Sequence, residues 1–327
     1  LLLFCILEYP LISQGIDRSQ IFIYGDFGVP DTLDPITANI ASEHHLCQFV
    51  FDSLLIENHK GDFIFSLAKN LDISPDGLSY TFILRKNLKW SDGKPLTTYD
   101  VQFTLKLMLN PKTYNYNSTL LKYIEDVICI TPRIVTITLA RPFYSPLSLF
   151  TFKILPKHKF EKEYLKFGDN FSEQPVGCGP FKYYRNKTNI FLLRNNSFFQ
   201  YRKEPFLKGI VSKIYSNKSQ AAQDLINGKL HLITEVLPKD IPRIEKHEKR
   251  FALKRYQNRT IHFAAFNHHR DHRYHELFKD YRFRRALLYS INREKILQDV
   301  FLAGSNKRNY RGQAHSVISG PFPINSW

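Results

Sequence analysis

The chain has 327 residues, of which 43% are hydrophobic and 23% charged, and it holds no low-complexity or glycine/serine-rich stretch. These values are typical of a globular protein with a large core, and a length near twice that of a common domain predicts two or three lobes. A small module and a disordered chain are excluded by this composition, and a solenoid is excluded because no internal repeat is found.

The formal net charge of +16 raises nucleic acid or an anionic surface as partners to consider. The basic residues are spread along the chain and interleaved with acids. The densest stretch, residues 239–285, holds fourteen Lys and Arg against six Asp and Glu, and it leads into a periodic helical pattern. This pattern favours a solvated basic face and no nucleic-acid partner. A basic nucleic-acid-binding or surface-binding protein is kept as an alternative class.

The chain opens with the mostly apolar stretch Leu1–Ile12, which Glu8 and Pro10 interrupt. This stretch is too short and too broken for a membrane-spanning helix. It is followed by Ser13-Gln14-Gly15, a small-x-small triplet of the kind that precedes a signal-peptide cleavage site. Residues 1–15 are therefore predicted to be part of a signal peptide, and the protein to be exported to the periplasm. A buried N-terminal strand and a mis-set start are the alternatives.

The first predicted elements are a short strand and a helix. Ile21–Gly25 reads as a buried strand closed by glycine, and Val29–Pro35 has the chemistry of a turn. A helix is predicted to start at Ser42 and Glu43. Its inward face, at three- and four-residue spacing, is expected to be Leu46, Phe49, Val50 and Leu54.

A strand, a turn and a helix are predicted next. Tyr80–Arg85 alternates as a half-buried strand does, and Trp90–Pro95 is a tight turn in which Gly93 can take a positive φ. A helix from Thr98 runs toward Asn110-Pro111, where proline stops it. Its inward residues are expected to be Val101, Leu105 and Met108.

The segment Pro175–Phe181 holds two glycines and two prolines in seven residues, which predicts a crossing of the backbone and a lobe boundary. Periodicity then predicts further strands, a helix closed by Asn227-Gly228, and a long amphipathic helix near the end. In chain order, the predicted elements are strands 134–139, 190–194 and 209–215, helix 219–227, strands 231–233 and 260–266, and helix 283–301.

No catalytic or metal-binding constellation stands out. The chain contains neither a phosphate-binding loop nor a nucleophile elbow. His268–His275 carries four imidazoles, but Arg270 and Arg273 repel a cation. Cys178 and His262 could be imagined as nucleophile and base, yet nothing in the sequence brings them together. We therefore predict no enzyme activity, no catalytic residue, no metal and no cofactor.

The cysteines lie far apart in the sequence, so they do not form a disulfide framework. One bridge among Cys47, Cys129 and Cys178 would suit an oxidising compartment. Buried, apolar, unpaired cysteines are the favoured interpretation.

Three segments carry a recognisable pattern. Leu84–Val101 matches the type LRxxxKWSDGxPxTAxDV nearly throughout, Pro175–Phe181 matches PVGTGPY with Cys178 in place of threonine, and Leu225–His231 matches LxxGEID except at the acids. Together they resemble the peptide-binding receptors of bacterial ABC importers, known as extracellular solute-binding protein family 5. Further similar stretches are Thr32–Pro35, Phe51–Leu55, Phe263–Asn267, Phe283–Leu287 and Ile291–Ile296.

The resemblance implies an α/β fold of the class II periplasmic-binding-protein type, with mixed-sheet lobes. On this scheme the chain begins in lobe I, makes lobe II, returns to lobe I and enters lobe III. The expected ranges are 1–15 for the partial signal peptide, 16–53 for the first part of lobe I, 54–174 for lobe II, 175–258 for the second part of lobe I, and 259–327 for the start of an incomplete lobe III.

The resemblance also implies a function. Members of the family hold an extended ligand between lobes I and III through main-chain hydrogen bonds, and lobe closure presents a surface to the permease. Short peptides and the permease subunits of an ABC importer are therefore the implied partners. The implied ligand neighbours are Asn39, Ile40, Ala41, Arg259, His262 and Phe263. Alternatively, Ile40 and Phe263 belong to the core, and His262 is a satisfied polar residue.

Family members continue well past the position of Trp327, through most of lobe III and the acidic residue that pairs with the amino terminus of the ligand. An unfinished sheet would expose apolar edges. A non-functional truncated remnant and a receptor for another solute are therefore kept as alternatives to the peptide receptor.

Overall fold

The computed structural model describes residues 20–58, 60–110, 123–160, 171, 174–186, 189–199, 205–254, 266–267 and 269–301. The chain divides into two compact units: unit 1 is Leu1–Asn217 with Gly228–Thr234, and unit 2 is Lys218–Asn227 with Glu235–Trp327. The division into three lobes stays a prediction.

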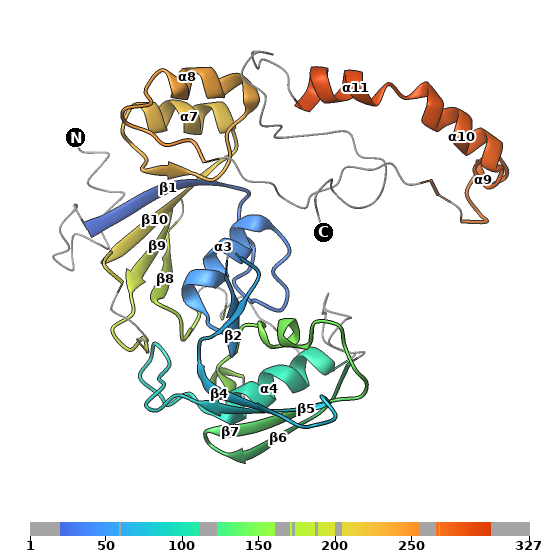
Figure 1. Ribbon diagram of the computed structural model, residues 1–327. Coiled ribbons are helices and arrows are strands. Elements are labelled where there is room, and N and C mark those ends of the chain that lie inside the picture. Colours follow the sequence, from blue (N-terminus) through green and yellow to red (C-terminus); the bar gives the residue numbers. More distant parts are fainter. Residues whose placement is uncertain are drawn as a thin grey trace. The chain divides into compact units, whose positions relative to one another are not determined.

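Unit 1 contains a five-stranded mixed sheet that brings together distant parts of the chain. The strand order is β11-β1-β10-β9-β8 (Figure 1). β1 is parallel to both of its neighbours, β10 and β11, whereas β9 is antiparallel to both of its neighbours, β10 and β8. The strands predicted at 21–25, 190–194, 209–215 and 231–233 are confirmed here. The bounds are β1 Ile21–Phe27, β8 Phe181–Arg185, β9 Asn189–Arg194, β10 Gly209–Tyr215 and β11 Leu232–Ile233.

Helix α3 (Ala41–Val50) contacts β1 and β8 of this sheet. Leu46 and Val50 are buried, as the helical spacing predicts. The prediction that Leu54 belongs to the same helix is wrong, because the backbone is already extended at Phe51. Leu54 is nevertheless fully buried, since the chain beyond the helix turns into the core.

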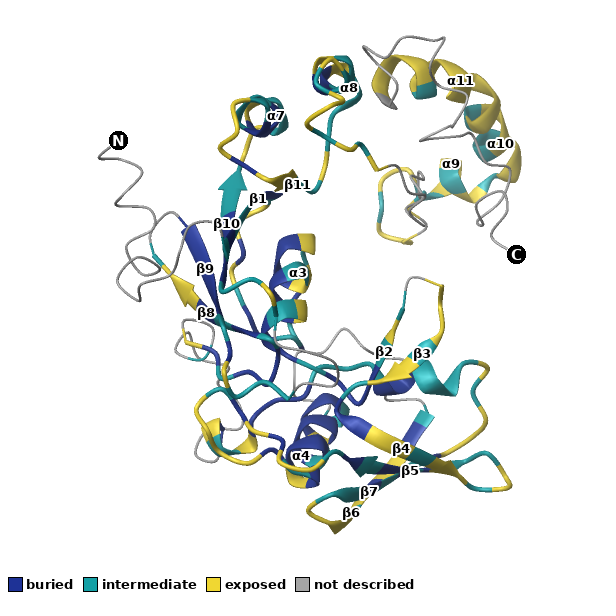
Figure 2. Cartoon of the chain, turned by 60° about the vertical axis from the view of Figure 1, so that its left-hand side comes forward, coloured by how far each residue is buried: buried dark blue, intermediate teal, exposed yellow. Residues whose placement is uncertain are grey.

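A four-stranded antiparallel sheet, in the order β4-β5-β7-β6, forms the second layer of unit 1, together with α4 and the hairpin β2-β3. β5 and β7 bury alternate residues, and α4 contacts β6 and β7 through a largely buried face (Figure 2). The predicted strands 80–85 and 134–139 and the helix from Thr98 are confirmed. The bounds are β2 Leu55–Glu57, β3 Phe63–Phe65, β4 Ala68–Ile73, β5 Ser79–Leu84, α4 Thr98–Leu109, β6 Ile124–Thr131, β7 Ile134–Leu139, η2 Pro146–Phe150 and η3 Lys157–Lys159.

The glycines of the predicted crossing segment lie against the end of α3. The amide of Gly179 donates to the carbonyl of Val50 at 2.8 Å. A Cβ atom on Gly177 would lie only 1.9 Å from that carbonyl oxygen, so no other residue fits without movement of the backbone. The prediction of a backbone crossing at this segment is confirmed.

Unit 2 is helical in its described residues. Helix α7 confirms the predicted helix 219–227, and Gly228 follows it with a φ of 76°. The prediction of one continuous helix over 283–301 is wrong: the chain is extended at Ile291, and the side chain of Asn292 accepts from the amide of Lys295 to start a new turn. The bounds are α7 Lys218–Ile226, η4 Pro238–Asp240, α8 Ile241–Glu245, α9 His275–Lys279, α10 Tyr281–Ser290, α11 Arg293–Ile296 and η5 Leu297–Phe301.

Two further predictions concern unpaired cysteines and strand 260–266. Cys47 and Cys178 are free and buried, which confirms the favoured interpretation for these two, whereas Cys129 is free but only half-buried. All but Phe266 of the predicted strand lies outside the described residues.

Candidate functional site

The carboxyl ends of the parallel strands β1, β10 and β11 meet at one edge of the mixed sheet. In open α/β sheets, ligands bind preferentially outside the carboxyl ends of the strands. We call this region the carboxyl edge and define it by Asp26 and Phe27 of β1, Thr234 after β11, and the loop and helix start at residues 28–45. All of it belongs to unit 1.

A buried carboxylate lies at the centre of the carboxyl edge. Asp26 is only 2% exposed. Its Oδ2 atom is 3.0 Å from Nδ1 of His45 on α3, and its Oδ1 atom accepts from the hydroxyl of Thr234 at 3.3 Å and from the amide of Phe27 at 2.9 Å. One side chain thus joins β1, α3 and the chain after β11, which fixes the position of the half-exposed His45.

Glu43 organises the loop that leads from β1 into α3. Its carboxylate accepts from the amides of Asp31 and Thr32 at 3.0 and 3.2 Å, and from those of Asn39 and Ile40 at 2.8 and 3.3 Å. Burial raises the pKa of Glu43, but these four amide hydrogen bonds outweigh it and hold the pKa below its ordinary value. A charged carboxylate therefore clamps both ends of the loop.

Asp34 in the same loop behaves in the opposite way. Burial raises its pKa to about 6, although the amide of Ile36 donates to it at 2.9 Å. Desolvation outweighs the hydrogen bond at this position. Near neutral pH, the loop therefore contains a buried carboxylate that gains a proton more readily than usual.

The structure places the three lobe I residues predicted to contact ligand at the carboxyl edge. Asn39 and Ala41 are exposed and Ile40 is half-buried. A Cβ atom on Gly28, the residue after β1, would lie 3.4 Å from Cδ1 of Ile40, so the start of α3 is adjacent to the end of β1. The other three predicted neighbours, Arg259, His262 and Phe263, lie outside the described residues.

The sequence analysis did not identify Asp26, His45 and Thr234 as candidates. The one usable signal was an acidic residue directly after a buried apolar strand, combined with the rule that ligands bind at carboxyl ends. No sequence signal connects Asp26 with Thr234, which lies 208 residues away.

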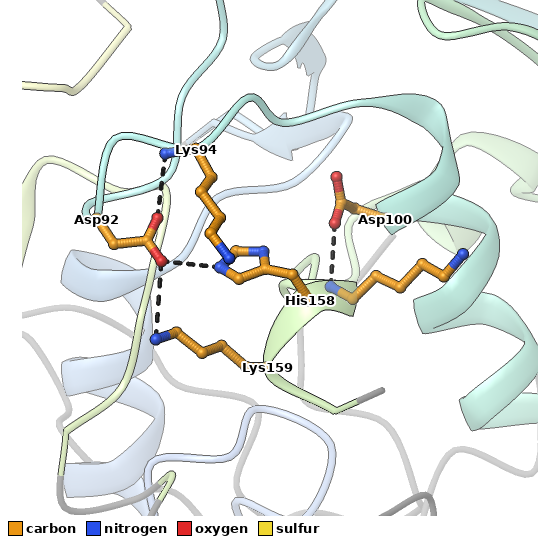
Figure 3. Close-up of polar contacts among 6 residues, drawn as sticks. Asp92, Lys94, Asp100, His158 and Lys159 are labelled. Atoms are coloured by element: carbon orange, nitrogen blue, oxygen red, sulfur yellow. Dashed lines mark hydrogen bonds and ion pairs between the residues drawn. The ribbon is translucent and has the colours of Figure 1, made fainter. Parts of the chain in front are cut away.

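Residues of the pattern-matching segment Leu84–Val101 form a second polar cluster with η3, in the other layer of unit 1 (Figure 3). Oδ2 of Asp92 is 2.8 Å from Nε2 of His158 and 3.7 Å from Nζ of Lys159, and Oδ1 accepts from the amide of Lys94. Burial raises the pKa of Asp92, but the hydrogen bond with His158 and the other contacts lower it by a larger amount, so the net shift is downward.

Asp100 performs a similar role at the start of α4. It accepts from the amide of Thr97 at 2.8 Å and from that of Lys157 at 3.0 Å, while burial keeps its pKa above the ordinary value. Together with Asp92 it holds η3 against the turn before α4. The predicted positive φ at Gly93 is confirmed, at 89°. This cluster joins two segments of the fold.

Cys178, which the sequence raised as an imagined nucleophile, is buried. Burial raises the pKa of the Cys178 thiol far above its ordinary value, which keeps it protonated and a poor nucleophile. Across the described ranges, no group of three or more His, Cys, Asp or Glu side chains is placed to hold a metal ion. None of the helices in this part of the chain combines the length and apolar character needed to cross a membrane.

Comparisons with known proteins identify the family of the chain and several similar proteins. The profile of a family described as bacterial extracellular solute-binding proteins, family 5 middle, matches residues 62–327. A protein of Brucella ovis named as an ABC transporter peptide-binding protein is 29% identical over 265 residues, which cover 80% of this chain and 48% of the relative.

Two solved structures resemble the chain over most of its length. NikZ from Campylobacter jejuni, in complex with Ni(L-His), is 26% identical with a TM-score of 0.74, over 87% of this chain and 55% of NikZ. AppA from Bacillus subtilis, in complex with a nonapeptide, shares the fold at 22% identity with a TM-score of 0.71, over 86% of this chain and 55% of AppA. The chain thus spans about half the length of these proteins.

Proposed function

Because this chain belongs to family 5 of the bacterial extracellular solute-binding proteins, we propose that it forms the peptide-binding part of a receptor that works outside the cytoplasmic membrane and delivers its ligand to the permease of an ABC importer. The expected α/β fold of the class II periplasmic-binding-protein type is confirmed by the structural neighbours. The family consists of substrate-binding proteins and not of enzymes.

The observation that carries the proposal is the carboxyl edge. It combines a buried acid, Asp26, with exposed residues Asn39 and Ala41 at the start of a helix, and Glu43 fixes the loop between them. A ligand at the carboxyl ends of the strands would lie against these exposed residues, and a peptide that is held mainly through its main chain is bound without strict selectivity for side chains. The rigid loop reduces the entropy lost on binding, because the protein side is already ordered.

The name of the Brucella ovis relative supports a peptide as the ligand, and AppA was solved with a nonapeptide bound. NikZ was solved with Ni(L-His). His45 of α3 contacts Asp26 at the carboxyl edge, so a metal–histidine complex is the second solute class that we include in the test.

The test is calorimetric and thermal titration of the whole chain with a pool of peptides of two to nine residues, and separately with Ni(L-His). A ligand that binds only the folded state raises the unfolding midpoint, and a hundredfold excess over Kd contributes about 2.7 kcal/mol. A saturable upward shift with peptides supports the proposal. A shift with Ni(L-His) alone would replace peptide by metal complex, and no shift with either would contradict a binding site in this part of the receptor.

Two matched variants locate the site. Ala41→Trp places a large ring on the exposed start of α3 and is expected to lower peptide affinity at least tenfold. Lys106→Trp places the same ring on an exposed position of α4, in the other layer, and is expected to leave affinity unchanged. Equal affinity of the two variants would show that the peptide binds away from the carboxyl edge.

A further inference from the structure

The edge strand β11 pairs with β1 over only two residues, and a side chain accepts one of the hydrogen bonds beside this pairing. The register pairs Tyr24 with Leu232 and Gly25 with Ile233. The amide of His231 donates to the carbonyl of Ile23 at 2.7 Å, and the amide of Thr234 donates to that of Gly25 at 3.3 Å. β11 is only two residues long, so each of these bonds matters for its position.

A further bond beside this pairing runs in the opposite direction. The amide of Ile23 donates to Nδ1 of His231 at 2.9 Å. An amide nitrogen is always a donor, so Nδ1 must carry a lone pair and the ring must be neutral, with its proton on Nε2. The ring of Phe22 stacks on the imidazole with the centroids 5.5 Å apart, which fixes the orientation of the acceptor.

An imidazolium donates from both nitrogens and cannot accept this bond. Histidine is the side chain that gains its proton between about pH 5 and 8. The LxxGEID pattern has an aspartate where this chain has His231, and an ionised carboxylate would accept the same bond over a wider range of pH. Acidification therefore removes one anchor of β11 in this chain.

Other titratable groups near β11 have partners of their own. On β1, Asp26 contacts His45 and Thr234, and on the far side of the strand Glu235 pairs with Lys218. The other titratable side chains on the neighbouring elements are Tyr24 on β1, Lys213 and Tyr215 on β10, Lys229 in the preceding turn and His45 on α3. Burial raises the pKa of Tyr24 to about 12, so its hydroxyl stays neutral between pH 5 and 8.

We infer that His231 is a positioning residue for the carboxyl edge: its neutral ring holds β11 on β1 and thereby keeps Thr234 against Asp26, and protonation of the ring loosens β11. The inference concerns the strand and does not depend on the proposed function. If that function holds, acid weakens ligand binding through the altered position of Thr234.

The test is hydrogen exchange followed by mass spectrometry on the whole chain at pH 7.5 and 5.5, for peptides covering β1 and β11, with rates corrected for the intrinsic effect of pH. In the wild type we expect protection of the Ile23 amide to fall about fivefold or more on acidification. His231→Asn keeps an acceptor near the position of Nδ1 but does not titrate, so its protection should be the same at both values.

His231→Gln is the matched control, because its amide oxygen lies one bond farther out and leaves Ile23 unpaired. Its protection should be low at both pH values. The inference is overturned if His231→Asn loses protection in acid as the wild type does, or if His231→Gln is as well protected as the wild type at pH 7.5. Because His231 is exposed, we expect both variants to fold, and circular dichroism checks this. Parallel peptide titrations at the two pH values test the functional consequence separately, and their failure leaves the strand result intact.

Discussion

The amide of Ser91 donates a 2.8 Å hydrogen bond to the carbonyl of Gly177. This bond joins the turn before α4 to the crossing segment that leads into β8, and the same glycine lies against Val50 at the end of α3. Three segments that are distant in sequence therefore meet at a point where no side chain fits.

Gly177→Ala is expected to destabilise the protein by at least about 3 kcal/mol, because the new Cβ would overlap the Val50 carbonyl and force the backbone apart. Gly93→Ala is the control: it has a φ of 89° and nothing within 4 Å of its Cβ position, so only conformational strain of about 1–2 kcal/mol is expected. Urea unfolding measures both. A smaller loss for Gly177→Ala than for Gly93→Ala would contradict the close approach.

Glu43→Gln is expected to destabilise the protein by about 3 kcal/mol, since hydrogen bonds to a charged acceptor are stronger and the new amide would face two N–H donors. The pKa of Glu43 is lowered in the folded state. Its contribution is therefore present above the unfolded value and is lost as the pH falls through the folded pKa.

The exposed Glu57→Gln provides the comparison for Glu43→Gln and should change the free energy of unfolding by less than about 0.5 kcal/mol. Denaturant titrations at pH 7 and pH 4 measure both variants. Equal effects of the two substitutions at pH 7 would show that the four-amide clamp does not stabilise the loop.

Asp34→Asn is expected to stabilise the protein above pH 6. Burial raises the pKa of Asp34 to about 6 in the folded state. The favourable contribution of this group is therefore complete below the unfolded value near 4 and is lost as the pH rises through 6. Asparagine keeps an oxygen for the amide of Ile36 and carries no charge to bury.

For Asp34→Asn the expected gain at pH 8 is about 2–3 kcal/mol, with little change at pH 4. Thermal unfolding across this range measures it, with the exposed Asp72→Asn as the control. If the unfolding midpoint of Asp34→Asn changes with pH in the same way as that of the wild type, Asp34 is not the titrating group.

The contact between Asp26 and His45 is expected to have a coupling energy of about 1–2 kcal/mol near pH 6, because one partner is buried while the other is half-exposed. A double-mutant cycle with Asp26→Asn and His45→Gln measures it by urea unfolding. Additive effects at pH 6 would contradict a favourable contact between the two side chains.

Local patterns in the sequence were sufficient for much of unit 1. The turn at Gly93, the helix from Thr98 and the strand Ile134–Leu139 were predicted because turn chemistry, capping and alternation act over a few residues. β4 was missed, since as an edge strand it carries Lys69, Asn70 and Asp72 and shows no alternation. The break at Ile291 was missed because a continuous apolar period concealed the new helix start at Asn292.

By itself, the sequence determined the family resemblance, the class of fold and the segment Asn39-Ile40-Ala41 as a candidate part of the site. Only the tertiary structure decided that His45 and Thr234 both contact the carboxylate of Asp26, and that the ring of His231 replaces a main-chain acceptor for the amide of Ile23. The physical reason is that parallel strands are joined by long crossover connections, so the register of β1 with β11 leaves no local trace in the residues that it brings together.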